Sequence, residues 1–97
     1  MSESQSTRLH ATVVGDVQGV GFRAFVLNTA QAMNLTGWVR NTYTGNVEVV
    51  AEGSHPILER LVDVLRKGPR SAYVDNVIVE WEKATGEFRE FSVTRTV

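Results

Sequence analysis

Gly15-Asp16-Val17-Gln18-Gly19-Val20-Gly21-Phe22-Arg23 joins a strand-like run to a helix-like run, and three of these nine residues are glycine. Glycine accepts positive φ and lacks a Cβ, so a glycine-rich turn can point several backbone N–H groups towards one centre. The following helix adds N–H groups that have no intrahelical acceptor, and Arg23 in its first turn adds a planar cation suited to phosphate or carboxylate. The segment therefore predicts an anion-binding site where a strand gives way to a helix.

The residues on either side of this segment follow two different periods. Residues 8–14 alternate between polar and apolar, which is typical of a half-buried strand. After the glycines, residues recur at helical spacing and predict one buried stripe, formed by Phe22, Phe25, Val26, Thr29, Ala30 and Met33. Asn34 is expected to end this helix, because asparagine accepts the left-handed conformation. Residues 1–7 are polar and aperiodic, so a disordered tail is expected there.

The rest of the chain completes a fold prediction. Four more strands are expected, at residues 36–42, 47–52, 74–82 and 88–94. The first two flank a turn at 43–46 and are expected to pair as a hairpin. A second helix is expected between Ser54, a candidate N-cap, and Gly68-Pro69. The order β-α-β-β-α-β, with one extra terminal strand, predicts an α+β fold of ferredoxin-like type. In this βαββαβ sandwich an antiparallel sheet carries both helices on one face, and residues 8–97 form one domain.

Length, charge and composition limit the function classes. The 97 residues allow one small core. A net charge of −1 and a pI near 6.1 argue against general affinity for nucleic acid or acidic membranes. The sequence has no cysteine, no secretory leader pattern and no apolar run of membrane length, so a monomeric cytoplasmic protein is expected. His10 and His55 lie in different elements without a cluster of other ligands, so neither a metal site nor a cofactor is expected.

Two segments of the chain together resemble the signature of a known enzyme family. Residues 17–23 read Val-Gln-Gly-Val-Gly-Phe-Arg, and residues 37–41 read Gly-Trp-Val-Arg-Asn. Both closely resemble the signature segments of the acylphosphatase family, and the resemblance extends from about Leu9 to about Val93. It implies a ferredoxin-like fold and the hydrolysis of a small acyl phosphate to a carboxylate and inorganic phosphate.

The resemblance also assigns roles to individual residues. The arginine of the Phe-Arg pair, here Arg23, binds the phosphate together with the loop amides. On this chain the loop comprises Gly15, Asp16, Val17, Gln18, Gly19, Val20, Gly21 and Phe22. The asparagine that ends the second segment, here Asn41, orients the nucleophilic water. No side chain in either segment is an obvious general base, so the substrate's own phosphoryl group is expected to take the water's proton.

Three more polar residues, Asp16, Thr42 and Thr44, lie next to the expected site in the sequence. Asp16 would repel an anion if its carboxylate faced the loop, so its side chain is expected to point outwards. Thr42 and Thr44 are candidates for hydrogen bonds that orient Asn41. Threonine near a turn serves at least as often to stabilise the turn itself, so both roles stay open at this point.

Two other functions are compatible with parts of the pattern. Residues 19–26 superficially resemble the aromatic segment of RNA-recognition motifs, but Phe22 and Phe25 fit a buried helical stripe better than exposed strand positions. The second alternative is a non-catalytic domain of acylphosphatase type that binds phosphate or carboxylate. Such domains also occur within larger carbamoyl-transfer proteins. An enzyme is preferred because both catalytic positions, Arg23 and Asn41, are filled.

Overall fold

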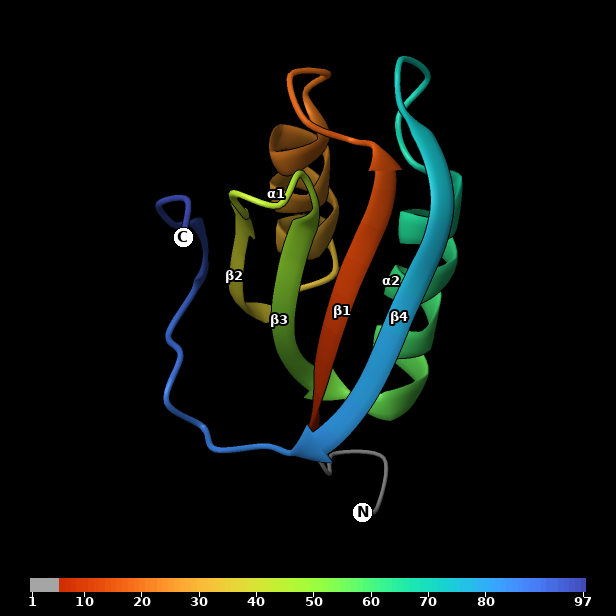
Figure 1. The fold of residues 1–97 in the computed structure, drawn as a ribbon. Coiled ribbons are helices and arrows are strands. Elements are labelled where there is room, and N and C mark those ends of the chain that lie inside the picture. Colours follow the sequence, from red (N-terminus) through yellow and green to blue (C-terminus); the bar gives the residue numbers. More distant parts are fainter. Residues whose placement is uncertain (1–5) are drawn as a thin grey trace.

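Two helices and five strands make up residues 6–97, the part of the chain that the computed structural model describes (Figure 1). The elements follow one another as β1 (Ser6–Asp16), α1 (Phe22–Ala32), β2 (Thr36–Asn41), β3 (Val47–Ser54), α2 (His55–Lys67), β4 (Tyr73–Lys83) and β5 (Phe91–Val93). The predicted order of helices and strands is confirmed. Of the predicted tail 1–7, residues 1–5 lie outside the described part of the chain, and Ser6 and Thr7 already pair with β3 as part of β1.

The five strands form one sheet in the order β4-β1-β3-β2-β5. β1 lies between β3 and β4 and is antiparallel to both, and β2 is antiparallel to β3. β5 differs, because it runs parallel to β2. The chain leaves β4 at the end of the sheet where β2 begins, crosses along residues 84–90 and enters β5 in the direction of β2 (Figure 1). The predicted ferredoxin-like sheet is therefore antiparallel over β1 to β4 and mixed at the β2–β5 edge.

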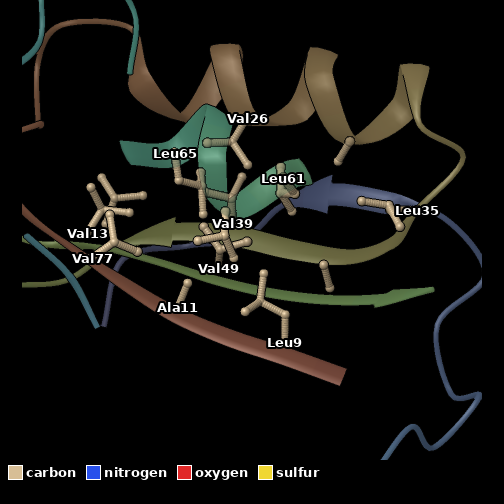
Figure 2. Packing of buried hydrophobic residues seen from close by; sticks show 14 of the residues in the cluster. Leu9, Ala11, Val13, Val26, Leu35, Val39, Val49, Leu61, Leu65 and Val77 are labelled. Atoms are coloured by element: carbon tan, nitrogen blue, oxygen red, sulfur yellow. The ribbon is translucent and has the colours of Figure 1, made fainter. Parts of the chain in front are cut away.

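Both helices cover the same face of the sheet, as predicted, and the hydrophobic core lies between helices and strands (Figure 1). Leu9, Ala11 and Val13 alternate along β1 onto this face, and none of the three has exposed surface. Figure 2 shows Val39 of β2 and Val49 of β3 in the same layer. Each valine or leucine buried in this way contributes about 1.5–3 kcal/mol. The layer thus fixes the position of α1 over β2 and β3.

The helix ends lie where the capping residues predict them. Gly21 takes the N-cap position of α1 with a left-handed φ of 80°. α1 ends at Ala32, and Asn34 follows with φ 57°, which confirms the expected termination. Ser54 is the N-cap of α2, but its side chain makes no capping hydrogen bond. Neither helix in the described residues is both long enough and apolar enough to span a bilayer.

The face of the sheet opposite the helices carries a buried carboxylate that holds the crossing segment 84–90. Glu52 in β3 has 5% of its surface exposed. It accepts hydrogen bonds from the backbone N–H groups of Thr85 (2.9 Å) and Gly86 (2.9 Å) and from Arg8 Nε (2.7 Å). Burial alone would raise the Glu52 pKa, but these hydrogen bonds outweigh it and hold the pKa below its ordinary value. Glu52 therefore anchors the crossing segment 84–90, which leads to β5, to strand β3 in the middle of the sheet.

Replacing Glu52 with glutamine is expected to lower the free energy of unfolding at neutral pH by about 3 kcal/mol, because Arg8 and two backbone N–H groups lose a charged acceptor. The pKa of Glu52 is lower in the folded than in the unfolded protein. The carboxylate therefore stabilises the fold above about pH 4.5, and this contribution is lost as the pH falls through the folded-state pKa.

Urea unfolding measured from neutral to acidic pH tests this expectation. The wild type should lose stability more steeply below about pH 4.5 than Glu52→Gln does. Glu90→Gln is the matched control, since Glu90 is exposed in the same crossing segment. The same pH dependence in all three proteins would show that Glu52 is not the stabilising carboxylate.

Candidate functional site

A pocket of about 370 Å³ opens where the loop after β1, the start of α1 and the end of β2 meet. Two of the residues that line it, Arg23 and Asn41, are the two predicted catalytic residues. The fold therefore brings the two segments of the sequence signature to one place. The complete lining consists of Val17, Gly19, Gly21, Phe22, Arg23, Ala24, Leu27, Asn41 and Val93.

The three glycines of the segment 15–23 serve different purposes. Gly15 lies in β1 at a shift of register against β4, and with φ 144° a Cβ there would meet the carbonyl oxygen of Tyr73 at 2.2 Å. Only glycine allows this approach of two backbones, so Gly15 has a structural role and lies outside the pocket lining. Gly19 and Gly21 do line the pocket, and a Cβ on either would meet no atom within 4 Å. The loop itself therefore comprises residues 17–21.

The first turn of α1 opens onto the pocket without an anionic partner. The helix begins with no side-chain cap and no acidic residue in its first turn. Phe22, Arg23 and Ala24 all line the pocket, and N–H groups at this point of a helix have no intrahelical acceptor. Arg23 forms no ion pair with any residue from 6 to 97. The helix dipole and the guanidinium group together make this side of the pocket positive.

Asn41 ends β2 on the face that the helices cover, opposite Val47 of β3. Its Oδ1 atom is buried and has no hydrogen-bond partner among the described residues. An unsatisfied buried acceptor costs about 1–3 kcal/mol, so such atoms are uncommon in proteins. Because Asn41 lines the pocket together with Arg23, its amide is a candidate to bind a water or ligand there.

The side chain of Gln18 joins the loop to the turn that follows Asn41. Its Nε2 donates hydrogen bonds to the carbonyl oxygens of Thr42 (2.7 Å) and Asn46 (2.8 Å). The neighbouring Val17 is 1% exposed and anchors the loop in the core. One amide group therefore links the two sides of the pocket, a role that the spacing of residues did not reveal.

Gln18→Glu is expected to lower the free energy of unfolding by about 3 kcal/mol, because two hydrogen bonds are lost and a carboxylate then faces two carbonyl oxygens. Gln18→Ala loses the same bonds without this repulsion and should cost about 1–2 kcal/mol. The control is Gln31→Ala, since Gln31 Nε2 makes one long contact of 3.4 Å with the carbonyl oxygen of Phe91. Urea unfolding measures all three variants. A Gln18→Glu protein as stable as the wild type would disprove the link.

Three other residues of the predicted loop, Asp16, Val20 and Phe22, have contacts of their own, and only Phe22 among them lines the pocket. Asp16 is exposed at the end of β1 and lies outside the pocket lining, in agreement with the expectation that it points outwards. The carbonyl oxygen of Val20 accepts a hydrogen bond from Ser71 Oγ (3.1 Å). Phe22 has 1% of its surface exposed, and its ring packs edge-on against Phe25 with the centroids 5.8 Å apart. The aromatic residues of this segment therefore belong to the core, as predicted.

Thr42 and Thr44 organise the turn between β2 and β3. Their hydroxyl groups lie 2.8 Å apart, and Thr42 Oγ1 accepts a hydrogen bond from the Asn46 N–H (3.1 Å). In residues 6–97 neither hydroxyl bonds to the side chain of Asn41. Of the two roles considered for these threonines, the structure shows the one in the turn.

His10 has more carboxylate neighbours than its place in the sequence predicts. Its Nε2 lies 2.6 Å from Glu48, and its Nδ1 lies 3.1 Å from Glu80. The ligand atoms of His10, Glu80 and Glu82 all lie within 4.8 Å of one another. The expectation that His10 has no such cluster around it is therefore wrong, because antiparallel pairing of β1 and β4 sets His10 opposite Glu80. Glu48 is further paired with Arg40 (2.8 Å), so these side chains form an ion network on the open face of the sheet, away from the pocket.

Three apolar residues of the pocket, Ala24, Leu27 and Val93, were not identified from the sequence. Leu27 lies one turn beyond Arg23 in α1, so helical spacing could have placed it there. Val93 lies at the pocket because β5 runs parallel to β2. No local pattern in the sequence indicates that pairing.

Comparison with known proteins agrees with this arrangement. The family model for acylphosphatase matches residues 9–93. An acylphosphatase of Salinibacter ruber is 42% identical over 95 residues, which cover 98% of this chain and 100% of that one. The structure of an acylphosphatase from Coxiella burnetii has a TM-score of 0.87 at 40% identity and covers 97% of this chain and 100% of that chain. Full-length HypF in the phosphate- and nucleotide-bound form also has a TM-score of 0.87, at 29% identity, and matches 96% of this chain with 12% of its own length. Because the match spans nearly the whole chain in both sequence and fold, the chain belongs to the acylphosphatase family.

Proposed function

We propose that the protein is an acylphosphatase, which hydrolyses the carboxyl–phosphate bond of an acyl phosphate to a carboxylate and inorganic phosphate. One observation carries the proposal. Arg23 and Asn41, which come from the two segments of the family signature, line one pocket at the uncapped start of a helix. Family membership makes the same activity the expected one.

The positive side of the pocket is proposed to hold the phosphoryl group. Backbone N–H groups of residues 17–21 and of the first turn of α1 would bind its oxygens, and Arg23 would add two parallel charge-assisted hydrogen bonds. In phosphoryl transfer the negative charge is spread over the equatorial oxygens. Donors that are in place before the reaction stabilise this charge without having to reorganise. Inorganic phosphate, as product, should bind at the same place.

Asn41 is proposed to align the attacking water. A side-chain amide has both a donor and an acceptor, and the Oδ1 of Asn41 has no partner in residues 6–97. A hydrogen bond from the water to this amide would direct an oxygen lone pair at the phosphorus atom. The water oxygen then forms a bond to phosphorus while the bond from phosphorus to the carboxyl oxygen breaks. The carboxylate leaves with the electron pair.

The proton of the water is proposed to move to a phosphoryl oxygen of the substrate. The described residues that line the pocket include no carboxylate, histidine, lysine or tyrosine. An acyl phosphate is also an activated anhydride with a good leaving group, so its cleavage needs little acid catalysis. A bell-shaped pH profile that is traced to one carboxylate or histidine of the protein would disprove this route.

Hydrolysis of benzoyl phosphate by the purified wild type, followed spectrophotometrically in the presence of a metal chelator, tests the proposed activity. Turnover is expected. A folded wild type that binds phosphate in calorimetry but shows no turnover with any acyl phosphate would instead be a non-catalytic binding module. The RNA-binding alternative is not favoured, because the side chain of Phe22, the first residue of α1, is buried in the core and offers no stacking surface.

We also propose a monomer as the active form and the cytoplasm as its location. All groups assigned to the reaction come from one chain and meet in one pocket, so catalysis needs no second subunit. A chain without cysteine suits a reducing compartment. Size-exclusion chromatography with light scattering tests the oligomeric state.

A further inference from the structure

We infer that Gln18 is a positioning residue for the hydrolysis: its side chain fixes where Asn41, which aligns the water, lies relative to the loop that holds the phosphoryl group. This inference rests on the proposed function. Gln18 lies outside the pocket lining, between Val17 and Gly19, which both belong to the lining. Its effect on turnover therefore passes through the residues that it holds in place.

The amide of Gln18 binds both ends of the turn that follows Asn41. Its Nε2 donates hydrogen bonds to the carbonyl oxygens of Thr42 (2.7 Å) and Asn46 (2.8 Å). The same Asn46 oxygen accepts the backbone N–H of Thr42 (2.9 Å), and this N–H belongs to the peptide group that joins Asn41 to Thr42. Because that planar group begins at the Cα of Asn41, the Gln18 hydrogen bonds restrain the backbone from which the Asn41 side chain projects.

The side-chain amide of Asn41 depends on this backbone for its position. Its Oδ1 is buried and has no hydrogen-bond partner among the described residues, and the Thr42 hydroxyl bonds within the turn. No hydrogen bond to Oδ1 therefore counteracts a shift of the turn. The loop has an anchor of its own, since Val17 is 1% exposed in the core. Loss of the Gln18 hydrogen bonds should thus move Asn41 and leave the loop in place.

In-line displacement makes turnover sensitive to this relative position. The water oxygen must lie opposite the leaving carboxyl oxygen, with the phosphorus atom between them. The loop and Arg23 are assigned to the phosphoryl group, and Asn41 is assigned to the water, so the alignment depends on two segments of the chain. Gln18 joins these segments. A misplacement of about 1 Å can cost about 10²-fold in rate, even where the changed residue lies away from the chemistry.

Gln18→Met tests the role, because methionine keeps the length of the side chain but has no N–H donor. With benzoyl phosphate, kcat should fall about 10–100-fold. KM and the Kd of inorganic phosphate should stay within about threefold of the wild type, since the loop keeps its place.

Val62→Ala is the matched control for a loss of stability alone. Val62 is 7% exposed in α2, outside the catalytic pocket, and alanine there buries less apolar surface. This variant should be less stable and keep the wild-type kcat. If Gln18 only stabilised the fold, Gln18→Met would keep the wild-type kcat as well.

A double-mutant cycle with Asn41→Ala tests whether Gln18 acts through Asn41. Asn41→Ala has no amide to align, so the addition of Gln18→Met should lower kcat by less than about twofold further. If the two losses multiply instead, the effect of Gln18 does not pass through Asn41, and the inference is overturned.

Binding of orthovanadate gives a readout that needs no turnover. Bound vanadate can accept a water oxygen as a fifth ligand, so it resembles the in-line arrangement of phosphoryl transfer more closely than phosphate does. The vanadate preference is the Kd of phosphate divided by the Kd of vanadate, both measured by calorimetry. We expect it to fall in Gln18→Met and in Asn41→Ala, and to fall no further in the double variant.

The two measurements separate this inference from the proposed function. If acyl phosphates are hydrolysed but Gln18→Met changes neither kcat nor the vanadate preference, the positioning role is disproved and the enzymatic function stands. If no acyl phosphate is hydrolysed while the vanadate preference falls in both single variants, the positioning role stands and the enzymatic function falls. A wild type with neither turnover nor a vanadate preference would overturn both.

Discussion

Replacement of Arg23 with alanine is expected to lower kcat/KM for benzoyl phosphate by about 10³-fold, the effect typical of losing an arginine that stabilises a transferring phosphoryl group. Both substrate affinity and turnover should fall, because the guanidinium group contacts the phosphoryl oxygens in the ground state and in the transition state. The fold should persist. Arg23 forms no ion pair within residues 6–97, so its removal breaks no such contact.

The conservative and control variants sharpen the Arg23 experiment. Arg23→Lys keeps the positive charge but loses the planar pair of donors, so it should fall between wild type and alanine. Arg60→Ala removes an exposed arginine of α2 and should behave as the wild type. Calorimetry with inorganic phosphate and circular dichroism complete the comparison. A folded Arg23→Ala protein with kcat/KM within about tenfold of the wild type would rule out the phosphate-binding role.

Replacement of Asn41 with alanine is expected to lower kcat by about 10²–10³-fold, the cost of removing one positioned polar group at a reacting centre. Affinity for inorganic phosphate should stay close to that of the wild type, because Asn41 is assigned to the water and not to the phosphoryl group. The free energy of unfolding should not fall. The side chain makes no hydrogen bond through Oδ1 within the described residues, so alanine removes an unsatisfied group.

Two further variants test whether Asn41 acts through its amide. Asn41→Asp keeps the shape but adds a negative charge beside the phosphoryl group, so it should lose both turnover and phosphate affinity. Asn28→Ala, at an exposed position of α1, is the control. If Asn41→Ala loses folding stability in parallel with activity, Asn41 has a structural role and the water must be placed by another group.

Much of the fold could be predicted from the sequence because its signals are local. Alternation in β1, the helical stripe of α1 and the left-handed Asn34 all depend on residues close together in the chain. The parallel pairing of β5 could not be predicted in this way. It depends on where the crossing segment is anchored, and that anchor, Glu52, meets Thr85 from 33 positions away. Non-local contacts of this kind leave no periodic trace in the sequence.

In the candidate site, too, features that depend on local sequence could be predicted, whereas features that depend on non-local contacts could not. The sequence signature places Arg23 and Asn41 in the site, and the glycines mark the loop between β1 and α1. The partners of Gln18 and the position of Val93 depend on which turn and which strand lie beside the loop in space. The role of Gly15 could not be predicted from the sequence either. Gly15 was expected to belong to the anion-binding loop, but it lies outside the pocket lining. A glycine is required there because the backbone of β4 lies too close for any Cβ.

β5 has only three residues, Phe91–Val93, and it pairs with a single neighbour at the edge of the sheet. Its detachment would expose Phe91 but leave the other four strands and both helices in place. Local opening of such an edge needs less free energy than global unfolding, and backbone amide exchange with solvent reports it. Because Val93 belongs to β5, a ligand that contacts it favours the paired state and slows exchange of the Thr94 N–H, which bonds to the Val39 carbonyl oxygen (2.9 Å). Occupation of the pocket and the lifetime of this edge pairing are thus thermodynamically linked.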